Sequence, residues 1–178
     1  MNKAHLKYLF FVTKPYSFSI LEPIQDVIIN SNCGDVKWFA ASSATKYSCP
    51  DDQLKSNKEV LEYDPDAVLV PGNVVPHFWP GLKVQIFHGL DEEVKGFYII
   101  TGFFDLYCTT GSVMTKKFSA MAKQKKHFLV KETGWPKLDP VFKNEWDFSD
   151  QKDQLIKQYN LNPELAVILY APTFPPKY

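Results

Sequence analysis

A histidine and a glycine follow directly after an apolar run in the segment KVQIFHGL, residues 83–90. The run at residues 84–87 has the composition of a buried strand, so His88 and Gly89 are expected at its carboxyl end. In an open parallel sheet, ligands bind at that edge. Histidine has an ordinary pKa near neutrality, so it can accept or donate a proton there. The pattern makes His88 a candidate catalytic base, and a hydrogen-bonded core histidine is the alternative at this point.

Two further residues of this region could contact a substrate. Gly89 would let a substrate approach the backbone, although a tight exit from a strand also favours glycine. Lys95 follows shortly after His88 and supplies a cation. It either meets a phosphate or is a solvated lysine. We predict both residues as substrate-binding, with these structural alternatives left open.

The composition limits the ligands that the chain can hold. Its 178 residues suffice for one domain with a sizeable core. The formal net charge is zero, which argues against nucleic acid as a partner. All 20 basic residues are lysine, so a phosphate site must use lysine, backbone N–H groups or hydroxyls.

The cysteines and the N-terminal segment indicate the cellular compartment in which the protein would work. Three cysteines without a CxxC pair predict neither a disulfide framework nor a zinc site and favour a reducing cytoplasm. The sequence also contains no cluster of carboxylates of the kind that binds other metals, so no metal site is predicted. The apolar stretch near the N-terminus is too short for a signal peptide or a membrane span.

Apolar runs and helical patterns alternate along the chain. Strands are predicted at residues 6–13, 36–41, 66–70, 83–87, 105–109, 128–131 and 165–170. Helices are predicted at residues 17–30, 51–63, 111–124 and 149–159, and loops at 71–80 and 134–140. The alternation predicts an α/β fold with a Rossmann-like, mostly parallel sheet flanked by helices.

The predicted elements place two more candidate substrate-binding residues. Gly111 opens a helix directly after a strand, and helix N-termini bind anions without arginine, although a capping role alone would also explain it. Lys137 lies in the loop Gly134-Trp135-Pro136-Lys137-Leu138-Asp139, which either forms only a rigid turn or also presents the lysine to substrate.

Six lysines and no acidic residue occur between positions 116 and 131. A solvated helix face is one interpretation. The other is attraction to an anionic membrane or phosphopolymer, worth about 1 kcal/mol per lysine near such a surface. The candidate docking residues are Lys116, Lys117, Lys123, Lys125 and Lys126.

Four segments, in this order, resemble a known family. They are KVQIFHG with Lys95 downstream, FDLYCTTG (104–111), ETGWPKLDPVF (132–142) and ILYAPTF (168–174). They are similar to the "Q-x-W-H-G", "D…x-x-G", "G-x-P-R-x-D" and "I-L-Y-A-P-T" motifs of the CDP-glycerol:glycerophosphate glycerophosphotransferases, the teichoic-acid polymerase and primase family. Phe87 replaces the usual tryptophan, and Lys137 occupies the arginine position.

The resemblance implies a GT-B-like fold of two Rossmann-type domains. Residues 1–162 would form the N-terminal, acceptor-side domain, and residues 163–178 would begin the nucleotide-binding domain, which would account for the last predicted strand. We therefore favour a chain that is the first part of a longer protein. The alternative is that this strand adds to the edge of the sheet.

The resemblance also implies the reaction. His88 would take a proton from an acceptor hydroxyl as it attacks the β-phosphate of CDP-glycerol or a related CDP-alcohol, with no cofactor. The acceptor would be a lipid-linked phosphopolymer or glycan at the inner face of the cell membrane, and the protein cytoplasmic or peripheral to that membrane. A related transferase with another acceptor, such as a capsule or lipopolysaccharide sugar, stays open.

Two other functions remain compatible with the residues. The chain could be a non-catalytic module that binds an anionic glycan, a lipid head group or a partner protein. It could also be part of a different GT-B enzyme, such as a sugar-nucleotide transferase or epimerase, because a fold does not fix a chemistry.

Overall fold

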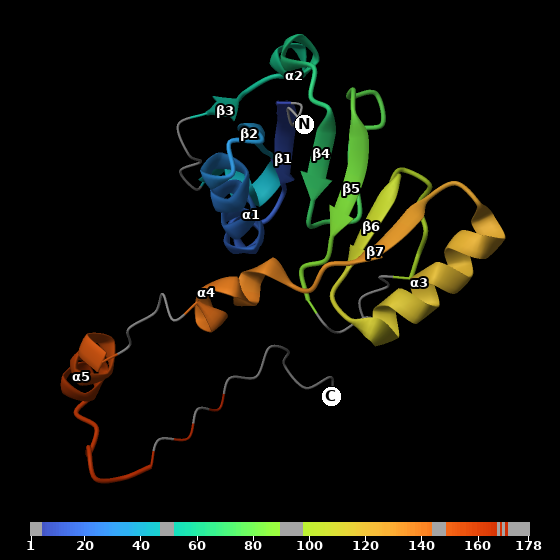
Figure 1. Cartoon of the computed structure of the whole chain (residues 1–178). Helices are drawn as coiled ribbons and strands as arrows, with labels where there is room; N and C mark the ends of the chain where they lie inside the picture. Colours follow the sequence, from blue (N-terminus) through green and yellow to red (C-terminus); the bar gives the residue numbers. More distant parts are fainter. Residues whose placement is uncertain are drawn as a thin grey trace, which may run out of the picture. The chain divides into compact units, whose positions relative to one another are not determined.

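The computed structural model describes residues 5–46, 52–89, 98–143 and 149–166, together with Ile168 and Tyr170. The chain divides into two compact units, Met1–Pro140 and Val141–Tyr178. In the described part of the first unit, seven strands form a single parallel sheet (Figure 1). This confirms the predicted α/β fold.

Strands and helices alternate through the first unit. The strands are β1 (Leu6–Val12), β2 (Gly34–Ala40), β3 (Gln53–Leu54), β4 (Ala67–Val70), β5 (Leu82–Ile86), β6 (Leu106–Thr109) and β7 (Leu129–Glu132). The α-helices are α1 (Phe18–Asn30), α2 (Asn57–Tyr63), α3 (Ser112–Lys125), α4 (Asp139–Phe142) and, in the second unit, α5 (Ser149–Gln158). Short 3-10 helices are η1 (Pro15–Ser17), η2 (Ser42–Lys46) and η3 (Pro136–Leu138).

The order of the strands locates the natural ligand edge of the sheet. Across the sheet they run β3-β2-β1-β4-β5-β6-β7. The chain therefore builds outward from β1 to β3, returns to β4 on the other side of β1, and continues to β7. Loops at the carboxyl ends of β1 and β4 diverge at this reversal, and in open α/β sheets that divergence forms the ligand crevice.

Strand β1 lies inside the sheet, and its side chains are apolar on both faces. Leu9 and Phe11 join one core cluster, and Phe10 and Val12 join the other, as expected when successive side chains point to opposite faces. The ring of Phe10 meets the ring of Trp38 edge to face, with centroids 5.0 Å apart.

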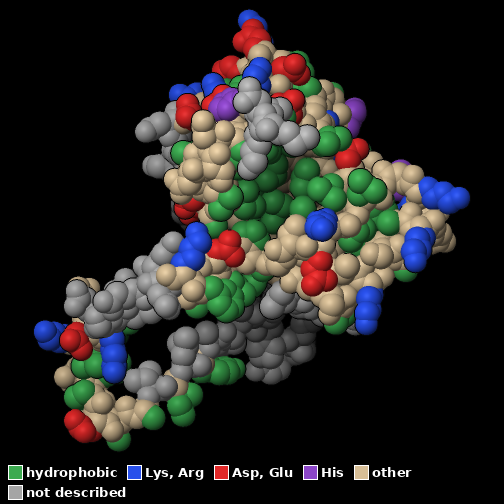
Figure 2. Space-filling model, in the orientation of Figure 1, with side chains coloured by type: hydrophobic (Ala, Val, Ile, Leu, Met, Phe, Trp, Pro, Cys, Tyr) green, Lys and Arg blue, Asp and Glu red, His purple; other side chains and the backbone are tan. Residues whose placement is uncertain are grey.

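Helices cover the two faces of the sheet unequally. Helix α1 packs its buried residues against the cluster of Phe10, and α2 and α3 pack theirs against the cluster of Leu9. On the α1 face, Leu82 of β5 and Leu129 of the edge strand β7 are exposed. Figure 2 shows hydrophobic side chains gathered over the middle of the sheet on the side in view.

Two predicted elements need correction. The helix predicted at residues 51–63 begins only at Asn57, where the Ser56 hydroxyl accepts from the Glu59 N–H at 3.2 Å, and the two-residue strand β3 precedes it. The loop predicted at 134–140 contains η3 and the start of α4.

The strand predicted at residues 165–170, as the start of a second domain, stays a prediction. None of its four described residues is in a strand, and Ile168 and Tyr170 are 91% and 86% exposed. An apolar run becomes a strand only where a neighbouring strand accepts and donates its backbone hydrogen bonds, and this run pairs with none of the seven described strands.

Candidate active site

Three loops supply the residues around His88. His88 lies two residues beyond the end of β5, Pro71 directly follows β4, and Tyr16 belongs to η1 after β1. These three strands are neighbours in the sheet. The predicted catalytic histidine therefore lies at the carboxyl edge, as expected, and beside the point where the strand order reverses.

A backbone carbonyl fixes the protonation of the His88 ring. The distance from His88 Nδ1 to the carbonyl oxygen of Pro71 is 2.8 Å. Because a carbonyl oxygen can only accept, Nδ1 must carry the proton in this hydrogen bond. The lone pair of the neutral ring is then on Nε2, which is the atom able to accept a proton from a substrate.

The turn that presents the Pro71 carbonyl is itself held by β5. Gln85 Nε2 donates to the carbonyl oxygen of Gly72 at 3.1 Å and to Asn73 Oδ1 at 2.8 Å. Gln85 is 3% exposed, and a buried amide of this kind needs such partners. Strand β5 therefore contributes both the histidine and the side chain that holds its acceptor in place.

An aromatic ring lies against His88 from the other side of the reversal point. The ring centroids of Tyr16 and His88 are 5.2 Å apart, with 31° between the planes. Burial raises the pKa of the Tyr16 phenol above its ordinary value, so at neutral pH it remains protonated.

Sequence reasoning did not identify Tyr16, Pro71 or Gln85. Gln85 left a signal, because it is the single polar residue in the apolar run after Lys83. The sequence shows Tyr16 only as a residue next to a proline after a predicted strand. Many loops have this pattern, so it does not indicate a site.

Neither of the two predicted glycines is packed against a described residue. A Cβ added to Gly89 or to Gly111 would meet no described atom within 4 Å. Gly111 is the N-cap of α3 with φ −178° and ψ 176°, a conformation open to any residue. Neither backbone strain nor described packing requires glycine at these positions.

Hydroxyl groups hold the turn between β6 and α3. Thr109 is fully buried, and its Oγ1 lies 2.6 Å from Oγ1 of Thr115. The Thr115 hydroxyl is in turn 2.8 Å from the Gly111 carbonyl oxygen and 2.7 Å from Glu132 Oε2, either of which can accept its proton. The N-terminus of α3 is therefore fixed at the carboxyl ends of β6 and β7.

Of the two lysines predicted to contact substrate, Lys137 is described by the structure and Lys95 is not. Lys137 belongs to η3, which packs against α1, so the segment after β7 runs back toward the β1 side of the sheet (Figure 1). The Lys137 ammonium lies 5.7 Å from the centroid of the Trp135 ring. No described contact joins Lys137 to His88, and Lys95 lies outside the described residues.

The five predicted docking lysines are all exposed on or just after α3. Lys116 and Lys123 are seven residues apart, so they share one face of the helix, away from buried Met114 and Phe118. The Lys117 ammonium lies 4.6 Å from the centroid of the Tyr98 ring, and Lys126 is the left-handed C-cap. The structure thus groups Lys116 with Lys123 and spreads the others.

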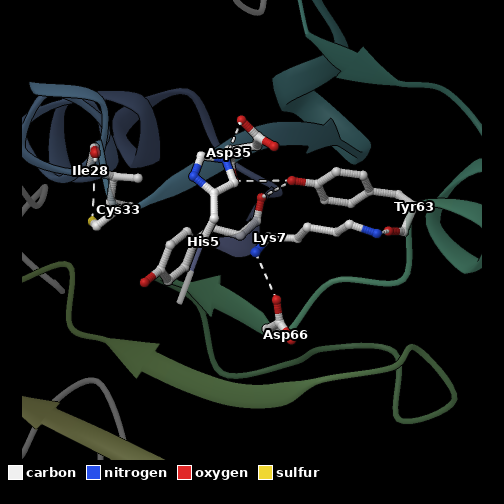
Figure 3. Close-up of polar contacts among 8 residues, drawn as sticks. His5, Lys7, Ile28, Cys33, Asp35, Tyr63 and Asp66 are labelled. Atoms are coloured by element: carbon white, nitrogen blue, oxygen red, sulfur yellow. Dashed lines mark hydrogen bonds and ion pairs between the residues drawn. The ribbon is translucent and has the colours of Figure 1, made fainter. Parts of the chain in front are cut away.

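A separate hollow of about 530 Å³ lies at the amino ends of β1 and β2. There His5 Nε2 lies 3.0 Å from Asp35 Oδ1, and the Tyr63 hydroxyl lies 3.0 Å from the Asp35 carbonyl oxygen (Figure 3). Both partners of the ion pair are more than half exposed, so it contributes little. His88 lies at the opposite edge of the sheet. That edge carries the carboxyl ends of the strands, where open α/β sheets bind their ligands.

Two negative findings apply to the described residues. They contain no group of three His, Cys, Asp or Glu side chains placed to hold a metal ion. No helix among them is long and apolar enough to cross a membrane.

The fold is that of a Rossmann-like domain, and His88 lies at the carboxyl edge of its parallel sheet. Residues 82–176 match the model of the CDP-glycerol:poly(glycerophosphate) glycerophosphotransferase family. The match spans more than half of the sequence, and the chain belongs to this family. It includes His88, Gly111 and Lys137, whereas Tyr16 lies before it. No curated protein matches the chain.

Proposed function

We propose that the chain is the acceptor-side domain of a glycerophosphotransferase that uses CDP-glycerol or a related CDP-alcohol. The acceptor is a hydroxyl group of a cell-envelope phosphopolymer or glycan. The observation that carries this proposal is the hydrogen bond from His88 Nδ1 to Pro71, which leaves Nε2 as the basic nitrogen. Family membership supplies the reaction type.

His88 acts as the general base. Its Nε2 takes the proton of the acceptor hydroxyl while the hydroxyl oxygen forms a bond to the β-phosphorus of the donor. The bond from that phosphorus to the bridging oxygen breaks, and CMP leaves with the electron pair. The transferred group is the polyol phosphate. No cofactor enters this scheme.

Lysines and backbone groups meet the phosphate charge, because the chain has no arginine. The N-terminus of α3 at Gly111 supplies N–H groups and the positive end of a helix dipole next to β5. Gly89 allows close approach, and Lys95 and Lys137 add positive charge. The nucleotide is bound by a second domain that begins after residue 162, so residues 1–162 serve the acceptor.

The lysines of α3 bring the enzyme to its acceptor. Lys116 and Lys123 on one exposed face favour contact with an anionic surface, and we assign the protein to the inner face of the cell membrane as a peripheral enzyme. The same face also favours the second candidate function, a non-catalytic module for an anionic glycan or lipid head group.

Replacing His88 tests the proposal. In the complete protein as its gene encodes it, His88→Ala should lower the transfer rate by about 10²- to 10⁴-fold, the usual contribution of a general base. Transfer is measured as labelled glycerol phosphate that enters a polymer acceptor, and folding by circular dichroism.

His127 provides the matched control. It is an exposed histidine outside the site, with Nδ1 3.4 Å from the Lys125 carbonyl oxygen, and His127→Ala should retain full transfer. If His88→Ala retains wild-type transfer as well, His88 is not the base and the binding-module function becomes the better explanation.

A further inference from the structure

We infer that Tyr16 is a positioning residue for His88. The inference rests on the proposed role of His88 as the base. It extends the site to the loop after β1, which lies outside the stretch matched by the family. Tyr16 acts through the imidazole ring and is not itself required to touch the reacting atoms.

Two contacts hold the imidazole ring of His88, one at its Nδ1 edge and one at a ring face. The Pro71 carbonyl holds the Nδ1 edge at 2.8 Å. By itself, a hydrogen bond at one edge permits a ring to rotate about the line between the two bonded atoms. The Tyr16 ring, 5.2 Å away and tilted by 31°, blocks this pivot because it occupies the space beside one face of the imidazole.

The Tyr16 ring can serve this purpose because its backbone is rigid. Pro15 opens η1 with a fixed φ, and the Ser17 N–H donates to the Lys14 carbonyl oxygen at 3.1 Å. The Ser19 hydroxyl donates to the Tyr16 carbonyl oxygen at 3.0 Å. The turn is thus closed by its own hydrogen bonds and continues directly into α1.

Loss of the ring should change which imidazole nitrogen carries the proton. A ring that pivots keeps the Nδ1–Pro71 bond for less of the time, so the tautomer protonated on Nε2 gains population. That tautomer cannot accept a proton at Nε2. The expected change in the tautomer ratio is about 2- to 10-fold, the range that a single aromatic contact supports.

The test is nitrogen NMR of the histidine rings in the ¹⁵N-labelled full chain, at alkaline pH where the imidazole is neutral. Two-bond proton–nitrogen correlations distinguish the two tautomers. Wild type should show His88 protonated on Nδ1, Tyr16→Phe should keep this pattern, and Tyr16→Leu should shift the ratio toward Nε2. Tyr16→Met provides a second variant without the ring if the leucine variant folds poorly.

A second stacked pair provides the matched control. Phe103 lies against His77 with centroids 6.4 Å apart and 23° between the planes. Phe103 is 41% exposed and Tyr16 44%, so their replacements perturb the fold to a similar extent. Phe103→Leu should leave the His88 signals unchanged.

The result separates this inference from the proposed function. In a folded Tyr16→Leu or Tyr16→Met chain, a wild-type His88 tautomer ratio overturns the positioning role, whatever the transfer assay shows. A shifted ratio supports it, even if His88→Ala retains transfer and the function itself fails. In the complete protein, Tyr16→Leu should lower kcat about 2- to 10-fold with KM unchanged, and Tyr16→Phe should restore it.

Discussion

Two glycines of the chain are glycine for different physical reasons. A Cβ on Gly34 would lie 2.2 Å from the Leu6 carbonyl oxygen, so the close approach of β1 to β2 requires its absence. A Cβ on Gly111 would meet no described atom within 4 Å. Packing explains the first glycine, and for the second we propose the approach of a substrate.

This contrast gives a prediction for paired alanine variants. Gly111→Ala should change the free energy of unfolding by no more than about 1 kcal/mol, yet lower transfer by about tenfold or more because its methyl group displaces the substrate. Gly34→Ala should cost about 1–3 kcal/mol or more through overpacking. Denaturant unfolding and the transfer assay measure both. Full transfer by Gly111→Ala would remove this residue from the binding site.

At the scale of elements, α3 combines two proposed functions in one helix. Its N-terminus lies at the carboxyl edge of the sheet after β6, the neighbour of β5, and its outward face carries Lys116 and Lys123. The opposite face packs Met114 and Phe118 into the core. The buried side fixes the orientation of the helix, so the outward lysines are presented on a rigid surface.

The lysine pair should therefore bind anionic membranes more strongly than other lysines do. Lys116→Gln with Lys123→Gln removes about 2 kcal/mol, so partitioning onto phosphatidylglycerol vesicles should fall about 30-fold. The measurement is vesicle sedimentation at low salt.

The control is a second pair with the same change of charge. Lys55→Gln with Lys58→Gln alters two exposed lysines at the start of α2 and should have a much smaller effect. At about 1 M salt the difference should vanish, because charges are then screened beyond about 3 Å. Equal losses in the two double variants would show that only net charge matters.

At the scale of the whole molecule, much of the fold could be predicted because a parallel sheet buries its strands on both faces. Such strands appear in the sequence as apolar runs, as at β1 and β5, and His88 was found because it follows one of them. The described residues of the run at 165–170 are not in a strand, because an apolar composition does not supply the neighbouring strand that pairing requires; for this run we expect that neighbour in the second domain.

The partners of His88 could not be predicted for a related reason. Tyr16 and Pro71 reach it only because β1, β4 and β5 lie side by side, and long-range pairing decides that order. Gln85 shows the same limit. One polar residue in an apolar strand is visible in the sequence, but the turn that it holds becomes visible only in the folded chain.

Burial of tyrosines in the core makes the stability of the whole molecule depend on alkaline pH. Burial raises the pKa of Tyr107, which is 1% exposed, to about 12, whereas an unfolded tyrosine titrates near 10. The folded state thus holds this proton at pH values where the unfolded state has released it. Its stabilising effect is complete below pH 10 and is lost as the pH rises through 10 to 12.

Tyr107→Phe should therefore flatten the decline of the free energy of unfolding between pH 10 and 12. One such proton contributes a slope of at most about 1.4 kcal/mol per pH unit. Burial also raises the pKa of Tyr8 and Tyr63, so a weaker decline should remain. Tyr159→Phe, at a position 62% exposed, is the control and should keep the wild-type slope. Urea unfolding at a series of pH values gives both slopes, and identical slopes for wild type and Tyr107→Phe would mean that the Tyr107 phenol titrates alike in the folded and unfolded chains.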